Sequence, residues 1–164
     1  MGLSEGEFRK RKNAEGSISD YLEEDLITFF DAKTQTEALT SLVDLLHDAG
    51  KLEDREAFYQ AILEREKIVS TGIGIGVAIP HAKLAGYDDF FIAIGIQKAE
   101  GMEWNALDGL PVRIVIMIGG PEDRQAEYLN ILSMITSAIK GEERRKILLK
   151  ANTKEEVLAV FAGV

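Results

Sequence analysis

Hydrophobic and polar residues are grouped along this chain in blocks that predict strands and helices in turn. Runs rich in β-branched and aromatic residues at 26–30, 90–96 and 112–118 predict strands. The third run is close to continuously apolar, which is typical of a strand at the centre of a sheet that is covered on both faces. The strand pattern therefore predicts one buried sheet.

Polar capping residues begin the helical blocks between and after these strands. Thr34 with Glu37 three residues later forms a capping box, and Gly50 supplies a helix stop. Asp54 can cap a second helix, and Thr153 begins another capping box near the end of the chain. Because helices alternate with strands, we expect an α/β fold, a three-layer α/β/α sandwich with helices flanking a central mixed β-sheet.

A further helix is predicted directly after the third strand. Pro121 and Glu122 suit its first turn, and Gly141 suits its end. Its predicted buried stripe consists of apolar residues at helical spacing, namely Leu129, Leu132, Ile135 and Ile139. We expect this stripe to face the core of the protein.

Composition limits the class of protein further. With 164 residues, 46% of them hydrophobic, the chain suits one compact domain over 17–164, preceded by a flexible N-terminal arm over 1–16. A formal net charge of −9 argues against a nucleic-acid partner. No segment reaches the roughly 20 apolar residues that span a bilayer, and the start of the chain lacks a signal-peptide core. We therefore expect a cytoplasmic protein that does not insert into a membrane.

Residues 71–81 read Thr-Gly-Ile-Gly-Ile-Gly-Val-Ala-Ile-Pro-His and place one imidazole, that of His81, behind alternating glycines. Backbone at Gly72 and the later glycines can approach an anion without Cβ obstruction, and the hydroxyls of Ser70 and Thr71 add donors. The proline before the histidine disfavours a helix there, so the histidine stands where an extended segment ends. The segment predicts a nucleophilic histidine beside an anion-binding loop.

Other interpretations of the same residues remain open. The glycines can simply form a turn, and a lone histidine is often structural. A dinucleotide fingerprint is absent, because the position that would need its third glycine is Val77. With two histidines and no cysteine, the composition does not favour a metal site. We interpret His47 as a surface residue and Trp104 as core packing.

The stretch 65–81, from Arg-Glu-Lys-Ile-Val-Ser through the glycines to Pro-His, closely resembles the phosphorylation-site signature of enzyme IIA domains of the fructose–mannitol type. This family belongs to the bacterial phosphotransferase system and includes a nitrogen-regulatory branch. The spacing between Arg65 and His81 is part of the match. Further landmarks of the resemblance lie at 20–22, 106–109 and 129–133. The resemblance thus covers most of the chain and leaves only the N-terminal arm outside.

The resemblance implies a phosphoryl relay. A histidine phosphocarrier protein would donate its phosphoryl group to Nε2 of His81, which would pass the group to a IIB component or hold it as a nitrogen-type regulatory mark on a target protein. Arg65 would offer a positive fork to the phosphoryl oxygens, and Ser70, Thr71 and Gly72 would add neutral donors. Neither a metal nor an organic cofactor is required.

One position departs from the family pattern. Many relatives carry a second histidine near the phosphorylation site, and the corresponding residue here is Tyr128. A tyrosine hydroxyl can donate a hydrogen bond to a phosphate but does not supply the charge of an imidazolium. We hypothesise that Tyr128 tunes the lifetime or transfer rate of the phosphoryl group. The departure also leaves an alternative open, a non-catalytic IIA-like binding module in which partner binding alone carries the function.

Overall fold

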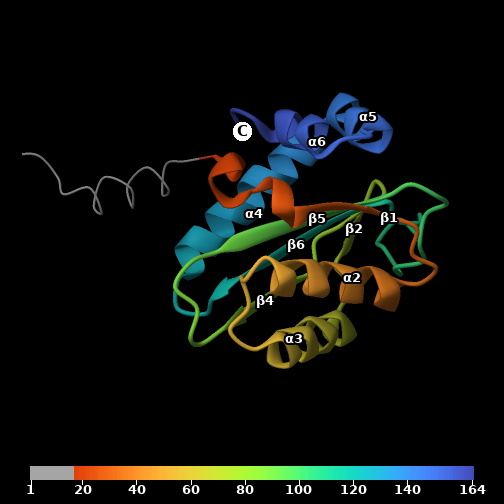
Figure 1. The fold of residues 1–164 in the computed structure, drawn as a ribbon. Coiled ribbons are helices and arrows are strands. Elements are labelled where there is room, and N and C mark those ends of the chain that lie inside the picture. Colours follow the sequence, from red (N-terminus) through yellow and green to blue (C-terminus); the bar gives the residue numbers. More distant parts are fainter. Residues whose placement is uncertain (1–16) are drawn as a thin grey trace, which may run out of the picture.

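The computed structural model of the protein describes residues 17–164, and the predicted N-terminal arm lies outside the described residues. Its elements form three layers, with helices on both faces of one sheet (Figure 1). The predicted three-layer α/β/α architecture is therefore confirmed.

The sheet forms the middle layer. Its strands are β1 (Ile27–Phe30), β2 (Gly72–Gly74), β3 (Val77–Ala78), β4 (His81–Leu84), β5 (Phe91–Gln97) and β6 (Ile114–Pro121). They are hydrogen bonded in the order β1-β5-β6-β3-β2, and β4 also pairs with β6. The pairs β5/β6 and β2/β3 are antiparallel, whereas the others are parallel, so the sheet is mixed as predicted. Every residue of β6 is buried, as its apolar run predicts for a central strand.

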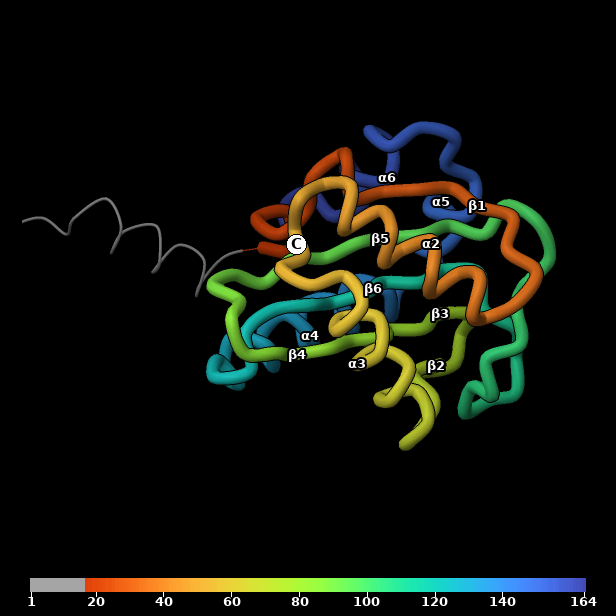
Figure 2. The backbone as a smooth tube through the Cα atoms, turned by 60° about the horizontal axis from the view of Figure 1, so that its bottom comes forward, coloured from red at the N-terminus to blue at the C-terminus, as the bar shows by residue number. Residues whose placement is uncertain are grey.

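Two helices cover one face of the sheet, as Figure 2 shows from their side. They are α2 (Gln35–Asp48) and α3 (Arg55–Ile68). The side chains of Thr34 and Asp54 accept hydrogen bonds from backbone N–H groups in their first turns, which confirms both predicted N-caps. Leu39, Phe58 and Ile62 pack from these helices against buried side chains of β5 and β6.

The opposite face is covered by α4 (Gln125–Ile139), α6 (Lys154–Phe161) and the first of two short 3-10 helices. Helix α5 (Glu142–Lys150) lies beside them, and the 3-10 helices span Ile18–Tyr21 and Glu24–Leu26. The hydroxyl of Thr153 caps α6 as predicted. Isoleucines of β5 and β6 pack against Ile131, Ile135 and Phe161 in this layer.

The start and phase of α4 differ from the prediction. Pro121 is the last residue of β6, where it pairs with Leu84, and α4 begins at Gln125. Leu129 is 52% exposed, whereas Tyr128 and Ile131 are buried. The prediction is confirmed for Ile135 and Ile139, which are buried, and is wrong for Leu129. Apolar residues at 128, 129, 131, 132, 134 and 135 leave two stripes with helical spacing in the sequence.

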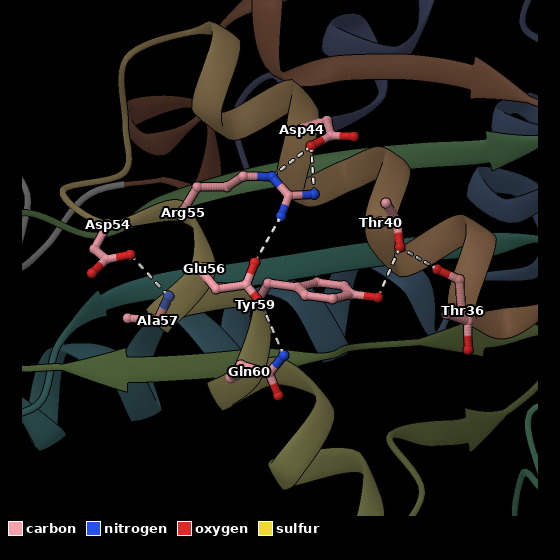
Figure 3. A network of polar contacts seen from close by, with 9 residues as sticks. All are labelled: Thr36, Thr40, Asp44, Asp54, Arg55, Glu56, Ala57, Tyr59 and Gln60. Carbon is pink, nitrogen blue, oxygen red and sulfur yellow. Dashed lines mark hydrogen bonds and ion pairs between the residues drawn. The ribbon is translucent and has the colours of Figure 1, made fainter.

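A polar network joins α2 to the beginning of α3 (Figure 3). The Arg55 side chain donates from Nε to Asp44 Oδ1 at 2.8 Å, and its guanidinium lies 5.2 Å from the centre of the Tyr59 ring. Thr40 donates to the Tyr59 hydroxyl at 3.0 Å. These contacts hold α3 against α2, so that its last turn carries Arg65 to strand β4.

Candidate active site

His81 is positioned by two short consecutive strands, β3 and β4, that pair with β6. Strands β3 and β4 follow one another alongside β6 (Figure 2), and both run parallel to it. The break between them falls at Ile79 and Pro80. The Pro80 carbonyl still accepts a hydrogen bond from Ile118 at 2.9 Å, which keeps the two strands in register. His81 is the first residue of β4, so the extended segment resumes at the histidine instead of ending there as the sequence predicted.

Both ring nitrogens of His81 have partners. Nδ1 lies 3.2 Å from the carbonyl oxygen of Ile79, and Nε2 lies 3.1 Å from Nε of Arg65. A carbonyl only accepts and a guanidinium only donates, so we assign the proton to Nδ1 and the lone pair to Nε2. The local chain therefore selects the tautomer whose Nε2 is the nucleophilic nitrogen.

The surroundings also favour the neutral ring. Burial lowers the pKa of His81 below its ordinary value, and the positive charges of Arg65 and Lys83 lower the pKa further, against the opposing effect of the Ile79 hydrogen bond. A depressed pKa keeps the imidazole unprotonated, and hence nucleophilic, at neutral pH.

Arg65 reaches His81 from the last turn of α3. Its Nη1 donates to the Val69 carbonyl at 3.1 Å, which satisfies one acceptor at the helix end. Within residues 17–164, no carboxylate lies within ion-pair distance of the Arg65 guanidinium. Its charge is therefore available to an anion at His81.

Tyr128, on α4, lies against the imidazole, near the site as the family resemblance implied. The centres of the His81 and Tyr128 rings are 5.4 Å apart, and Tyr128 is 5% exposed. Burial raises the pKa of Tyr128, so its hydroxyl stays protonated and can act as a donor at neutral pH.

Lys83 is a further member of this site, and it was not among the residues predicted from the sequence. Its Nζ lies 4.1 Å from the centre of the Tyr128 ring and donates to Oε1 of Gln125. The signal was present in the sequence, because residues two apart on a strand share a face and His81 and Lys83 are so spaced in β4. The buried Ala82 between them faces the opposite layer.

The other predicted site residues lie in a second polar cluster beyond the end of α3. Ser70 donates to the Trp104 carbonyl at 2.5 Å, and the Gly72 N–H donates to the Ser70 hydroxyl at 3.1 Å. Thr71 donates to Glu66 from both its hydroxyl and its backbone N–H. The hydroxyls of Ser70 and Thr71 therefore have internal acceptors, and neither forms a hydrogen bond with the His81 ring.

Glu66 is the centre of this second cluster and was also missed. Besides Thr71, its carboxylate accepts from Trp104 Nε1 at 3.3 Å and from Gln35 Nε2 at 3.2 Å. The predicted core role of Trp104 is confirmed by its 2% exposure, and its indole N–H additionally joins this cluster. Trp104 and Gln35 are far from Glu66 along the chain, so spacing alone could not reveal these two partners.

The described residues place further limits on the kind of site. None of the helices between residues 17 and 164 is long and apolar enough to cross a membrane. Across the same span, no three or more histidine, cysteine, aspartate or glutamate side chains are grouped so that they could hold a metal ion.

The fold is that of IIA proteins of known structure. The nitrogen regulatory protein IIA-Ntr from Neisseria meningitidis superposes with a TM-score of 0.81 and 28% identity, covering 88% of this chain and 98% of that one. IIA mannitol from Escherichia coli, at 24% identity, shares the fold with a TM-score of 0.73 over 85% of this chain and 98% of its own. The fold and the histidine site thus define an IIA-type α/β domain.

The family follows from the sequence match. The family described as "Phosphoenolpyruvate-dependent sugar phosphotransferase system, EIIA 2" matches residues 20–163, and the chain belongs to it. The chain is 37% identical over 131 residues to the fructose-specific EIIA component of Haloferax volcanii, covering 80% of this chain and 84% of that protein. It is 39% identical to the fructose-specific EIIABC component of Bacillus subtilis, of which it spans 20%.

Proposed function

We propose that this protein is a phosphoryl carrier that accepts a phosphoryl group from a histidine phosphocarrier protein on Nε2 of His81. The contact that carries the proposal is the pair of hydrogen bonds on the imidazole, which leaves the lone pair on Nε2 and places a guanidinium beside it. Membership of the EIIA family supports the same assignment, because its members are components of a phosphotransferase system.

The transfer is balanced without a cofactor. The Nε2 lone pair of His81 attacks phosphorus, the N–P bond of the donor breaks, and the donor imidazole leaves with the electron pair of that bond. The proton on Nδ1 stays where it is, held by the Ile79 carbonyl. Because this proton keeps the phosphorylated ring cationic, the ring can later leave as neutral imidazole when the phosphoryl group moves on.

Arg65 has to change partner during this step. In the present state its Nε–H points at the Nε2 lone pair, 3.1 Å away. Once phosphorus occupies that position, the guanidinium donates to phosphoryl oxygens instead, an interaction that exists only as the N–P bond forms. Tyr128, whose hydroxyl forms no hydrogen bond with another described residue, supplies a neutral donor nearby. The role of the remaining predicted donors is to hold the backbone beyond α3 in place through their internal hydrogen bonds. These donors are Ser70, Thr71 and Gly72.

Exposed apolar side chains support transfer between two proteins. Ile73 and Ile75 are 38% and 43% exposed on the hairpin of β2 and β3, whereas the neighbouring Val77 is buried in the core. Leu107, on the turn that bonds this hairpin, is 87% exposed. We propose that these side chains contact the phosphoryl donor and acceptor.

The relatives of this chain suggest two kinds of protein as the acceptor of the phosphoryl group. A IIB component of a sugar transporter would follow the fructose-specific relatives, at 39% and 37% identity. A regulatory target protein would follow the nitrogen regulatory protein of Bradyrhizobium diazoefficiens, 28% identical over 74% of this chain and 80% of that protein. A cytoplasmic location is part of either proposal, because the phosphocarrier donor must reach His81.

The presence of Tyr128 favours one second candidate, a IIA-like module that binds partners without carrying phosphate. Incubation with phosphoenolpyruvate, enzyme I and the histidine phosphocarrier protein separates the two. A carrier incorporates acid-labile phosphate in the native protein and none in His81→Ala, with His47→Ala as the matched control that incorporates normally. Absence of label in the native protein, while the donor itself is labelled, would support the binding module.

A further inference from the structure

The relay leaves one charge at the site without a role. Lys83 Nζ rests on the Tyr128 ring, and within residues 17–164 it has no carboxylate at ion-pair distance. Its hydrogen-bond acceptor is the neutral amide oxygen of Gln125. In a chain with a net charge of −9, this lysine is held close to His81 without being neutralised.

Strand β4 and helix α4 together fix the position of Lys83. Strand β4 places it on the same face as His81, and the first turn of α4 supplies Gln125. The Tyr128 ring contacts both side chains, with its centre 5.4 Å from that of the imidazole and 4.1 Å from Nζ. A cation on the face of an aromatic ring keeps its positive charge and loses part of its freedom. The Lys83 ammonium is therefore held near the imidazole of His81.

We propose that Lys83, supported by the Tyr128 ring, supplies the second positive charge to the phosphoryl group on His81. The residue at 128 then acts as a platform that positions a cation, where the resemblance places a second histidine in relatives. When His81 is phosphorylated, the dianionic group draws Nζ from the Gln125 amide onto a phosphoryl oxygen, because a charge-assisted hydrogen bond is stronger than one to a neutral amide. This role rests on the proposed phosphorylation of His81.

The first test measures the effect of the Lys83 charge on the pKa of His81 in the unphosphorylated protein. NMR titration of His81 compares the native protein with Lys83→Met and Lys83→Arg. If Nζ acts on the ring, Lys83→Met raises the pKa of His81 and Lys83→Arg leaves it unchanged. Lys33→Met removes the same charge from a site near the far edge of the sheet and is the matched control. An unchanged pKa in Lys83→Met would overturn the proposal.

The second test measures transfer from a small donor, phosphoramidate, whose N–P bond breaks to release ammonia as the bond to Nε2 forms. A small donor separates charge stabilisation from docking between proteins. Loss of one charge-assisted hydrogen bond predicts a rate about 10-fold lower in Lys83→Met. The rate in Lys83→Arg should stay within about 3-fold of native, because a cation remains.

Variants of Tyr128 distinguish the ring from its hydroxyl. Tyr128→Phe keeps the platform and loses only the neutral hydroxyl donor, so its rate should fall less than that of Lys83→Met. Tyr128→Leu removes the platform as well and should be at least as slow as Lys83→Met. The double variant Lys83→Met with Tyr128→Leu should be no slower than Lys83→Met with Tyr128→Phe, because the ring acts only through the ammonium. Multiplying effects, or a native rate in Lys83→Met, would overturn the role of Lys83 while leaving the carrier function intact. A native protein that no donor phosphorylates would overturn the carrier function itself.

Discussion

Two neighbouring residues at the end of α3, Arg65 and Glu66, lead into polar clusters of opposite character. The Glu66 cluster is closed, because its carboxylate accepts from Thr71, Trp104 and Gln35 and leaves little capacity for a ligand. The cluster of His81 is open, because Arg65 and Lys83 approach it without a carboxylate partner among the described residues.

The comparison distinguishes polar residues that stabilise the fold from polar residues that take part in the chemistry. A closed cluster stabilises the fold. If a buried donor lost its acceptor, the free energy of unfolding would fall. An open cluster gains its strongest contacts only when an anion arrives, so it contributes to transfer more than to stability. Substitutions in the open cluster should therefore change phosphoryl transfer, and those in the closed cluster should change stability.

The largest effect is expected for Arg65→Ala. Removal of a charged donor from the transferring group predicts a rate of His81 phosphorylation about 100-fold lower, with a small change in melting temperature. Arg55→Ala on the same helix is the control: it breaks the network of Figure 3 and should lower stability slightly without slowing transfer. Equal losses of transfer in the two variants would show that Arg65 acts through helix stability alone.

A smaller effect is expected for Gly72→Ala, at the edge of the closed cluster. A Cβ at this position would lie 2.9 Å from the Cβ of Ala106 and 3.2 Å from the Trp104 ring. Such overpacking predicts a loss of about 1–3 kcal/mol in the free energy of unfolding, measured by urea denaturation. Adding Ala106→Gly should restore part of the loss, and failure to do so would argue against a clash at this contact.

Thr71→Val tests the closed cluster by removing one hydroxyl. Glu66 and Trp104 each lose a hydrogen-bond partner, so the free energy of unfolding should fall by about 1–2 kcal/mol. Thr40→Val, in the more accessible network of α2 and α3, should cost less. Chemical denaturation measures both. A transfer rate that collapsed in folded Thr71→Val would instead place this hydroxyl on the phosphoryl group.

The smallest effect is the pH dependence of stability that His81 contributes. Its pKa is depressed in the folded state, so the unfolded chain binds the proton more readily as the pH falls below about 6.5. The contribution is therefore complete above that pH and is lost as pH falls toward the folded pKa. Calorimetry from pH 7 to pH 5 should show a weaker decline for His81→Gln than for native protein. His47→Gln removes the other histidine as a control, and a steeper decline in His81→Gln would contradict the depressed pKa.

Local chemistry made much of the fold predictable. The caps at Thr34, Asp54 and Thr153 bind one backbone group a few residues away, so their signals survive in any tertiary context. The phase of α4 was not predictable in this way, because the choice between Leu129 and Tyr128 depends on which side of the helix meets the sheet. Helix α5 carries one buried residue, Leu148, and so gives no clear stripe.

The candidate site likewise contains contacts that the sequence predicts and contacts that it does not. The pairing of Arg65 with His81 lies within one recognisable stretch of sequence, and the structure brings the two together. The links of Lys83 to Tyr128 and of Glu66 to Trp104 cross between elements that are far apart along the chain. Such contacts depend on strand register and helix phase, which the pattern of residues does not determine.

The most direct measurement of the central claim is the position of phosphorus on the ring. Protein with ¹⁵N-labelled histidine is phosphorylated through the relay and examined by ¹⁵N and ³¹P NMR. The hydrogen bonds from Nδ1 to Ile79 and from Arg65 to Nε2 predict a single phosphoryl group bonded to Nε2 of His81, with Nδ1 still protonated below the pKa of the phosphorylated ring. Phosphorus on Nδ1, on another residue, or absent from a protein incubated with labelled donor would contradict the account.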